Sequence, residues 1–112
     1  MAGGVAASRC LHVDVSLHPG YPPTVNHDAP MERLSATAER VGLRVHTMPS
    51  PVMGAEDFSY MMEKVPGSFA FLGARTDGGG PLHSDLMKID EGSLQQGAAL
   101  HAAVAISSLM QA

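Results

Sequence analysis

Hydrophobic and polar positions alternate along two short stretches of the chain, and a third stretch is apolar at nearly every position. The alternating stretches are residues 9–17 and 43–48, and the apolar run is residues 68–72. Alternation with a period of two predicts a half-buried strand, and a continuous apolar run predicts a strand covered on both faces. We therefore expect three strands. The apolar side of the first strand consists of Leu11, Val13, Val15 and Leu17.

Three other stretches have the spacing of helices. The first begins at Asp28, a good N-cap residue, has Pro30 in its first turn, and ends before Gly42, placed as a C′ residue. The second begins near Glu56 and Asp57, whose carboxylates suit a helix N-terminus. Its apolar stripe is Phe58, Met61, Met62 and Val65, and Pro66-Gly67 ends it.

The last helix is expected from Asp90, as N-cap, to Met110. Its sides are apolar nearly all round, which predicts a buried helix, and His101 within it is then a core histidine. The order strand, crossing, helix, strand, helix, strand, loop, helix predicts an α/β fold. Residues 19–27 are rich in proline and form the crossing, and residues 1–8 form a disordered start.

Length and charge narrow the possible functions. The chain has 112 residues, a net charge of -4 and no run of Lys or Arg, so a nucleic-acid partner is not expected. No apolar run approaches the roughly 20 residues of a membrane span, and residues 1–8 lack the charged and apolar regions typical of a signal peptide. The compartment stays unknown. The single cysteine, Cys10, has no partner for a disulfide within the chain.

His83 is the candidate site residue that the pattern itself singles out. It follows a glycine-rich loop after the third expected strand, where sites are common in α/β folds. Histidine is the commonest metal ligand, but a catalytic zinc takes about three protein ligands. The partners of His83 are then Glu56, Asp57 or Asp85, or lie outside this chain. His12 and Asp14 share a strand face, for which a solvated polar stripe is the simpler interpretation.

Three blocks of sequence together resemble a family of metal-dependent amidohydrolases. The family comprises hippurate hydrolases, N-acyl-amino-acid amidohydrolases and plant indoleacetyl-amino-acid (auxin conjugate) hydrolases. The resemblance covers nearly everything from Arg9 to Leu109. The blocks are Gly20-Tyr21-Pro22-Pro23-Thr24-Val25-Asn26, Met53-Gly54-Ala55-Glu56-Asp57-Phe58-Ser59-Tyr60 and Leu82-His83-Ser84.

The resemblance implies a zinc-peptidase-like catalytic α/β domain interrupted by a smaller lid, which often dimerises. Residues 9–18 then match the last strand of the lid, residues 19–27 the return crossing, and residues 28–112 the C-terminal part of the catalytic domain. His83 falls on the last ligand of a centre of two divalent ions, Mn or Zn. The family's other ligands and its general-base glutamate precede the lid and have no counterpart here.

The resemblance also implies a function. We expect a fragment of an amidohydrolase that cleaves N-acyl amino acids, such as auxin-amino acid conjugates. We expect it to be inactive alone, because one histidine ligand cannot hold two metal ions and the chain lacks the other ligands and the general base. Asn26 is expected to contact substrate, and Glu56 and Asp57 to support the site. A second copy of the chain is an expected partner, in a homodimer. The alternative is a non-enzymatic interaction or dimerisation module that uses its first strand as an edge.

Overall fold

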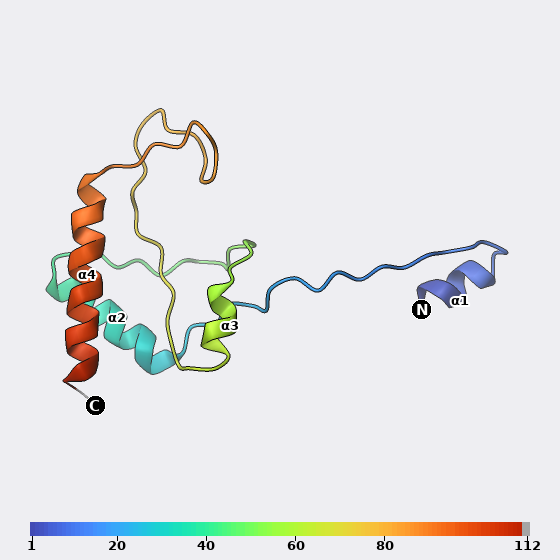
Figure 1. Cartoon of the computed structure of the whole chain (residues 1–112), viewed down its shortest axis with the longest axis horizontal. Coiled ribbons are helices and arrows are strands. Elements are labelled where there is room, and N and C mark those ends of the chain that lie inside the picture. The colour runs from blue at the N-terminus through green and yellow to red at the C-terminus, as the bar shows by residue number, and fades with distance from the viewer. Residues whose placement is uncertain (111–112) are drawn as a thin grey trace.

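The structure, a computed structural model, describes residues 1–110 as four helices joined by long irregular segments (Figure 1). A small body holds three of the helices, and an extended arm leads from it to the first helix. Within the described residues, α2 and α4 are the one pair of helices that pack together. The helices are α1 (Ala2–Ala7), α2 (Asp28–Arg40), α3 (Phe58–Met62) and α4 (Gly92–Leu109).

Helix α2 ends as its sequence predicts. Gly42 has a φ of 84°, a conformation that glycine adopts without a steric penalty. The N–H of Gly42 donates to the carbonyl of Glu39 at 3.0 Å, and that of Leu43 to the carbonyl of Ala38 at 2.9 Å. These two bonds form a Schellman motif, which satisfies carbonyls at the helix end. At the other end the N-cap is His27 rather than Asp28, which becomes the first helical residue.

Helix α3 is shorter than the expected stripe. It covers Phe58–Met62, and Val65, at the far end of the stripe, is exposed. Met62 is buried, but Met61 is exposed. Glu56 supports the helix start, because its side chain accepts from the N–H of Phe58 at 3.1 Å. The predicted helix is therefore present, with only part of its apolar stripe covered.

Helix α4 begins at Gly92 with Glu91 as its N-cap, one residue later than the predicted N-cap Asp90. The Asp90 carboxylate still supports the helix start, because it accepts from the N–H of Gly92 at 2.9 Å. The expectation that this helix is buried is wrong. Leu94 is 58% exposed and Ile106 60% exposed, whereas the buried residues are Ser93 and Ser107. His101, expected in the core, is exposed. The physical reason is a lack of cover, because α2 is the one element packed against α4.

The α/β fold class is not what the described residues show, because none of the three expected strands belongs to a sheet. Residues 9–17, 43–48 and 68–72 carry no strand assignment, and one antiparallel bridge joins Arg75 to Ile89. A strand is stabilised by bonds to neighbouring strands, and the segments that alternate lie apart from one another here. The alternating segments are present in the sequence, but no neighbouring strand pairs with them within residues 1–110.

Helix α1 occupies part of the start that we expected to be disordered. Its cap region repeats the geometry of α2, since Leu11 donates to the carbonyl of Ala6 and Cys10 to that of Ala7. Cys10 has a φ of 55° in the position where Gly42 stands in α2. The alanine-rich composition favours a helix, although nothing on it is buried.

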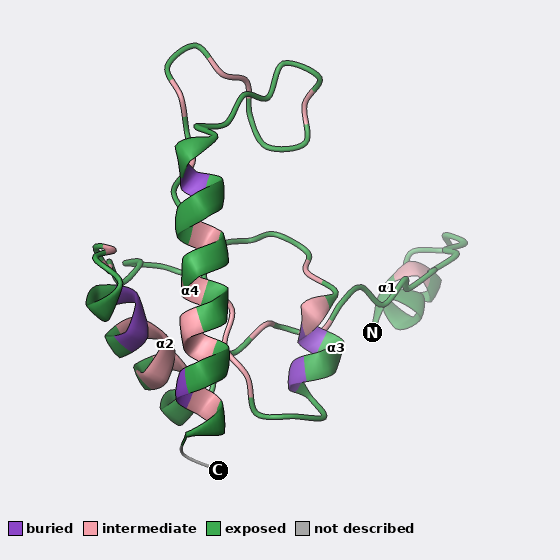
Figure 2. Cartoon of the chain, turned by 60° about the vertical axis from the view of Figure 1, so that its left-hand side comes forward, coloured by how far each residue is buried: buried purple, intermediate pink, exposed green. Residues whose placement is uncertain are grey.

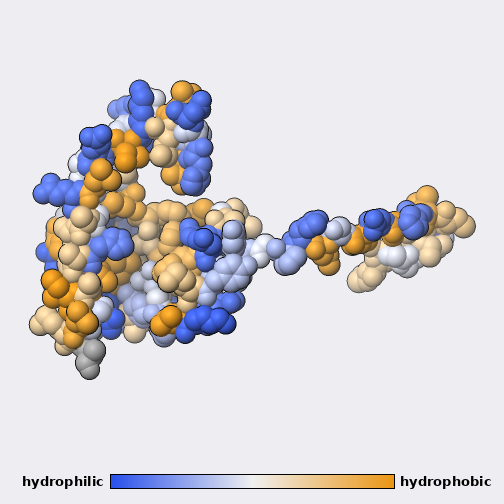
Figure 3. Space-filling view, in the orientation of Figure 1, coloured by the Kyte–Doolittle hydropathy of each residue, from blue (hydrophilic) through white to orange (hydrophobic). Residues whose placement is uncertain are grey.

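Much apolar surface is uncovered over the whole molecule. The chain exposes 9575 Å², whereas a compact monomer of its mass exposes about 5,900 Å². Its radius of gyration is 20.4 Å, against about 13 Å for a compact domain of this length. Exposed residues dominate Figure 2, and apolar residues stand on the visible face in Figure 3. In residues 1–110, no helix combines the length and apolar character that a membrane crossing requires.

Candidate functional site

His83 stands on a lobe formed by residues 73–90. Two backbone bonds close the lobe: Asp90 donates to Ala74 at 2.8 Å, and Gly80 donates to Leu86 at 2.8 Å. The hydroxyl of Thr76 adds a bond to the carbonyl of Lys88 at 3.3 Å. The lobe encloses a hollow of about 470 Å³ whose lining is mainly apolar. The long glycine-rich segment is therefore an ordered loop.

The backbone of His83 lies in the left-handed region, with a φ of 67°. It is the third residue of a turn in which the N–H of Ser84 donates to the carbonyl of Pro81 at 3.1 Å. Glycine or asparagine normally takes this position, because a side chain there is strained. The side chain of His83 is exposed. An exposed imidazole held in an unfavourable backbone conformation is the kind of outlier that functional sites contain.

Close packing at Gly80 shapes the turn that carries His83. A Cβ atom at this position would lie 2.6 Å from Ser84 Oγ and 2.9 Å from Leu86 Cβ. The hydroxyl of Ser84 in turn accepts from the N–H of Leu86 at 3.2 Å. Any side chain at position 80 would overlap Ser84 and Leu86, so the tight turn at residues 81–84 depends on this glycine.

The structure does not bring Glu56 and Asp57 to His83. Both residues come directly before α3 in the chain, whereas the lobe adjoins the N-terminal end of α4. Figures 1 and 2 show the lobe and α3 well apart. No group of three His, Cys, Asp or Glu side chains that could hold a metal occurs among residues 1–110. His12 and Asp14 are exposed on the arm. The donors within this part of the chain do not fit a two-metal centre on their own.

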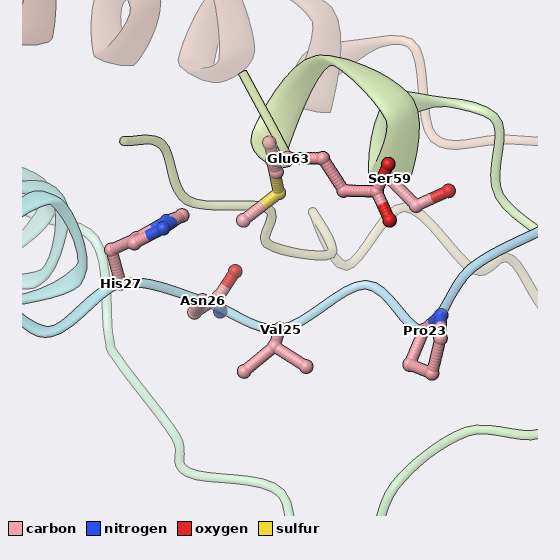
Figure 4. A pocket seen from close by; sticks show the side chains of 7 residues that line it. Pro23, Val25, Asn26, His27, Ser59 and Glu63 are labelled. Carbon is pink, nitrogen blue, oxygen red and sulfur yellow. The ribbon is translucent and has the colours of Figure 1, made fainter. Parts of the chain in front are cut away.

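Asn26 lies at the end of the proline-rich crossing, beside α3 (Figure 4). Its Nδ2 donates to the carbonyl of Phe69 at 2.9 Å, and its Oδ1 accepts from the N–H of Phe69 at 2.7 Å. A contact from Nδ2 to the sulfur of Met31 measures 3.4 Å. One lone pair of Oδ1 stays free for another donor. The pocket beside Asn26, about 250 Å³, is lined by Pro23, Val25, Asn26, His27, Ser59, Met62 and Glu63.

His27 is a residue whose part in this region the sequence did not indicate. Its backbone N–H donates to the carbonyl of Gly67 at 3.1 Å. Its ring atom Nδ1 lies 3.2 Å from the backbone nitrogen of Gly67. The residues are 40 positions apart in the chain. The sequence offered one signal, the position of His27 directly before a predicted helix. Polar residues are common at that position, so it did not predict a contact with Gly67.

Comparisons with known proteins agree with the resemblance seen in the sequence. Residues 2–107 match the peptidase family M20/M25/M40. The chain is 38% identical over 113 residues to the IAA-amino acid hydrolase ILR1-like 2 of Arabidopsis thaliana, covering 95% of this chain and 26% of that protein. It is 44% identical over 89 residues to ILR1-like 6 of the same plant, covering 76% of this chain and 19% of that protein.

A bacterial relative gives the same picture. The N-acetyl-L-cysteine deacetylase of Bacillus subtilis (strain 168) is 38% identical over 87 residues, which are 78% of this chain and 20% of that protein. The chain thus spans about a fifth to a quarter of the length of these relatives. No solved structure matches it significantly. The resemblance to amidohydrolases is confirmed by these matches, whereas the roles of single residues stay predictions.

Proposed function

Because this chain belongs to peptidase family M20/M25/M40, we propose that it forms the C-terminal part of the catalytic domain of an N-acyl-amino-acid amidohydrolase. Residues 9–18 would be the last strand of the lid, and residues 19–27 the return crossing. The family indicates a zinc-peptidase-like fold, in which the uncovered stretches would meet strands and helices supplied by other parts of the enzyme. The exposed apolar surface of the arm and of α4 supports this proposal.

The observation that carries the proposal is the presentation of His83. The enzymes of this family are generally metal-dependent, and histidine is the commonest metal ligand in proteins. This chain presents His83 on an ordered lobe, exposed and in a strained backbone conformation. We assign His83 as one ligand of a pair of Mn or Zn ions. The other donors would come from outside these residues, so no catalytic step follows from this chain alone.

The reaction we propose for the whole enzyme is hydrolysis of an amide. The C–N bond of an N-acyl amino acid breaks, the acyl carbon gains the hydroxyl of water, and the amine gains its proton. Auxin-amino acid conjugates are the proposed substrates, because two relatives are named as IAA-amino acid hydrolases. Asn26 could contact substrate only through its free Oδ1 lone pair, as an acceptor. Glu56 would support the site indirectly, by stabilising the start of α3.

An activity assay tests the proposal that the isolated chain is inactive. The purified chain is incubated with hippurate or an indoleacetyl-amino acid, with and without Mn²⁺, and amino acid release is measured. We expect no turnover, because a lone ligand does not hold two ions. Turnover that disappears in His83→Ala but persists in His101→Ala, a matched exposed histidine on α4, would contradict inactivity.

Metal binding tests the role of His83 separately. Chemical shifts of all six histidines are followed by NMR during titration with Zn²⁺. When the chain is mixed with a separately produced N-terminal part of an IAA-amino acid hydrolase, we expect the His83 resonances to change first. Unchanged His83 resonances in an active mixture would contradict its assignment as a ligand.

A second candidate function is an interaction or dimerisation module. The arm favours it, because Leu11 and Leu17 are 66% and 87% exposed on an extended segment with a free edge. Sedimentation velocity over a range of concentrations tests this candidate. Concentration-dependent dimers without turnover would support it, and a monomer at every concentration would exclude self-pairing.

A further inference from the structure

The crossing segment, residues 21–27, is fixed to the body at both of its ends. At one end the ring of Tyr21 meets the ring of Tyr60 in α3, edge to face, with centroids 5.6 Å apart. At the other end Asn26 bonds to Phe69 and His27 bonds to Gly67. Figure 4 shows the segment between Pro23 and His27 running past α3. The crossing is therefore attached to the body at both of its ends.

The Asn26 side chain makes the same exchange of bonds that a backbone residue makes in a β ladder. Its amide nitrogen donates to the carbonyl of Phe69 at 2.9 Å, while its oxygen accepts from the Phe69 N–H at 2.7 Å. A primary amide has the donor and the acceptor that this pairing requires. Neither alanine nor aspartate can supply both groups.

The neighbouring His27 makes a second exchange, with Gly67. The His27 N–H donates to the Gly67 carbonyl at 3.1 Å. The Gly67 N–H can bond to Nδ1, 3.2 Å away, only if that nitrogen carries no proton. Nδ1 also lies 3.2 Å from the Gly67 carbonyl oxygen, which already accepts from the His27 backbone N–H. The tautomer protonated at Nε2 therefore satisfies both bonds, and we assign it on that ground. Four bonds thus join two adjacent residues to residues 67 and 69, which lie 40 or more positions later.

The freedom of the arm lies on the other side of Tyr21. Pro19 and Pro22 fix their own φ angles, and each proline restricts the residue before it. Between them Gly20 alone is unrestricted, and no atom lies within 4 Å of the place its Cβ would take. Backbone bonds within residues 1–110 also stop at Leu11 and resume at His27.

From these observations we propose that Asn26 and His27 form a clasp, and that the arm pivots at Gly20 rather than along the whole crossing. The clasp makes the crossing part of the body, so it positions the arm without moving itself. If the proposed hydrolase function holds, Gly20 is where the lid turns against the catalytic domain. The pivot itself belongs to this chain and does not depend on metal or turnover.

Distances between spin labels test the pivot. One label is placed on the native Cys10 in the arm and one on Ala105→Cys, an exposed position of α4. Double electron–electron resonance on the full chain should give a broad distance distribution. Gly20→Pro should narrow it, because the added ring removes the freedom of the pivot. Gly54→Ala, a glycine substitution within the body, should leave it unchanged.

Amide exchange followed by NMR tests the clasp. Asn26→Ala should raise exchange at Phe69 by about tenfold or more, since it removes the acceptor of the Phe69 N–H. Asn26→Asp keeps that acceptor and loses only the donor to the Phe69 carbonyl, so it should raise exchange less. His27→Ala should do at Gly67 what Asn26→Ala does at Phe69. His27→Asn should restore protection, because its Oδ1 can accept from the Gly67 N–H in the place of Nδ1, and the Gly67 carbonyl, 3.2 Å from Nδ1, still accepts from the backbone N–H of residue 27. Amides of α4 report whether any variant has lost its fold.

The outcomes separate the two parts of the proposal. An unchanged distance distribution in Gly20→Pro, or equal narrowing in Gly54→Ala, would overturn the pivot. Unchanged exchange at Gly67 and Phe69 in the alanine variants, or failure of His27→Asn to restore protection, would overturn the clasp. If an alanine variant also loses amide protection in α4, the His27→Asn result decides whether the clasp exists. This variant keeps the acceptor and is closest in shape to the original side chain. An inactive or metal-free chain affects neither result.

Discussion

Among residues 1–110, two residues other than glycine have a positive φ, and they have different explanations. Cys10 follows α1 in the position that Gly42 takes after α2, so its conformation belongs to a helix ending. His83 is in a turn on an exposed lobe, where glycine would be less strained. A left-handed conformation costs about 1–2 kcal/mol for a residue with a Cβ. The strain at His83 is one of the observations that support its proposed role as a ligand.

Replacing Gly42 by alanine should destabilise the chain by about 1 kcal/mol, because the added Cβ opposes the left-handed conformation in the Schellman motif. Thermal unfolding followed by circular dichroism measures the change. Gly54→Ala is the matched control, since its Cβ would make only an ordinary 3.7 Å contact with Val52. Equal losses in the two variants would contradict the assigned role of Gly42.

Replacing His83 by glycine should stabilise the chain by about 1 kcal/mol, since it removes the strained side chain from the turn. Urea unfolding measures the gain. His83→Asn should lie between the two, because asparagine tolerates the left-handed region better than most residues. A loss of stability in His83→Gly would mean that the imidazole makes a favourable contact in the folded chain.

At the scale of elements, helix ends followed local signals and strand pairing did not. Asp90, Pro30 and Gly42 act within a turn of their own positions, so the three body helices could be predicted from sequence. The alternation of residues 9–17 predicts a strand but not its neighbour, which depends on distant chain. The clasp was hidden for the same reason: Asn26 and Phe69 are 43 positions apart, and neither residue type announces the contact.

The lobe allows a prediction at this scale. Gly80→Ala should destabilise it by about 1–3 kcal/mol, because the new methyl group would overlap Ser84 and Leu86. We expect the NMR resonances of residues 81–86 to shift while those of α2 stay in place. Gly73→Ala, where a Cβ meets open space, serves as the control. Unshifted resonances near His83 would show that the turn does not depend on Gly80.

At the scale of the whole molecule, the arm is independent of the body in packing. Every residue from Cys10 to Gly20 is exposed, and Figure 1 shows this segment leading away from the helices of the body. The apolar side of the arm is available for pairing, and its polar side carries His12, Asp14 and Ser16. Family membership could be predicted from the sequence. The absence of a sheet in residues 1–110 could not, since alternation says nothing about which partners are present.

Serine at Leu11, Val15 and Leu17 together should reduce self-association without changing thermal stability, because none of these side chains packs on the body. Sedimentation velocity and thermal unfolding measure the two effects. A control variant changes the polar side, with His12→Ser and Ser16→Ala, and should associate as the original chain does. A large fall in unfolding temperature in the triple variant would show that the arm contributes to the fold.

Gly97 in α4 has a consequence for the whole lobe. A Cβ at this position would lie 3.0 Å from Cδ2 of Leu72, so the bare backbone sets how near the apolar run comes to the helix. The run continues directly into the lobe that bears His83. A larger residue at position 97 would require the end of the Leu72 side chain to shift by a few tenths of an ångström. A substitution on α4 would thereby disturb the apolar run that leads into the lobe, without touching the lobe itself.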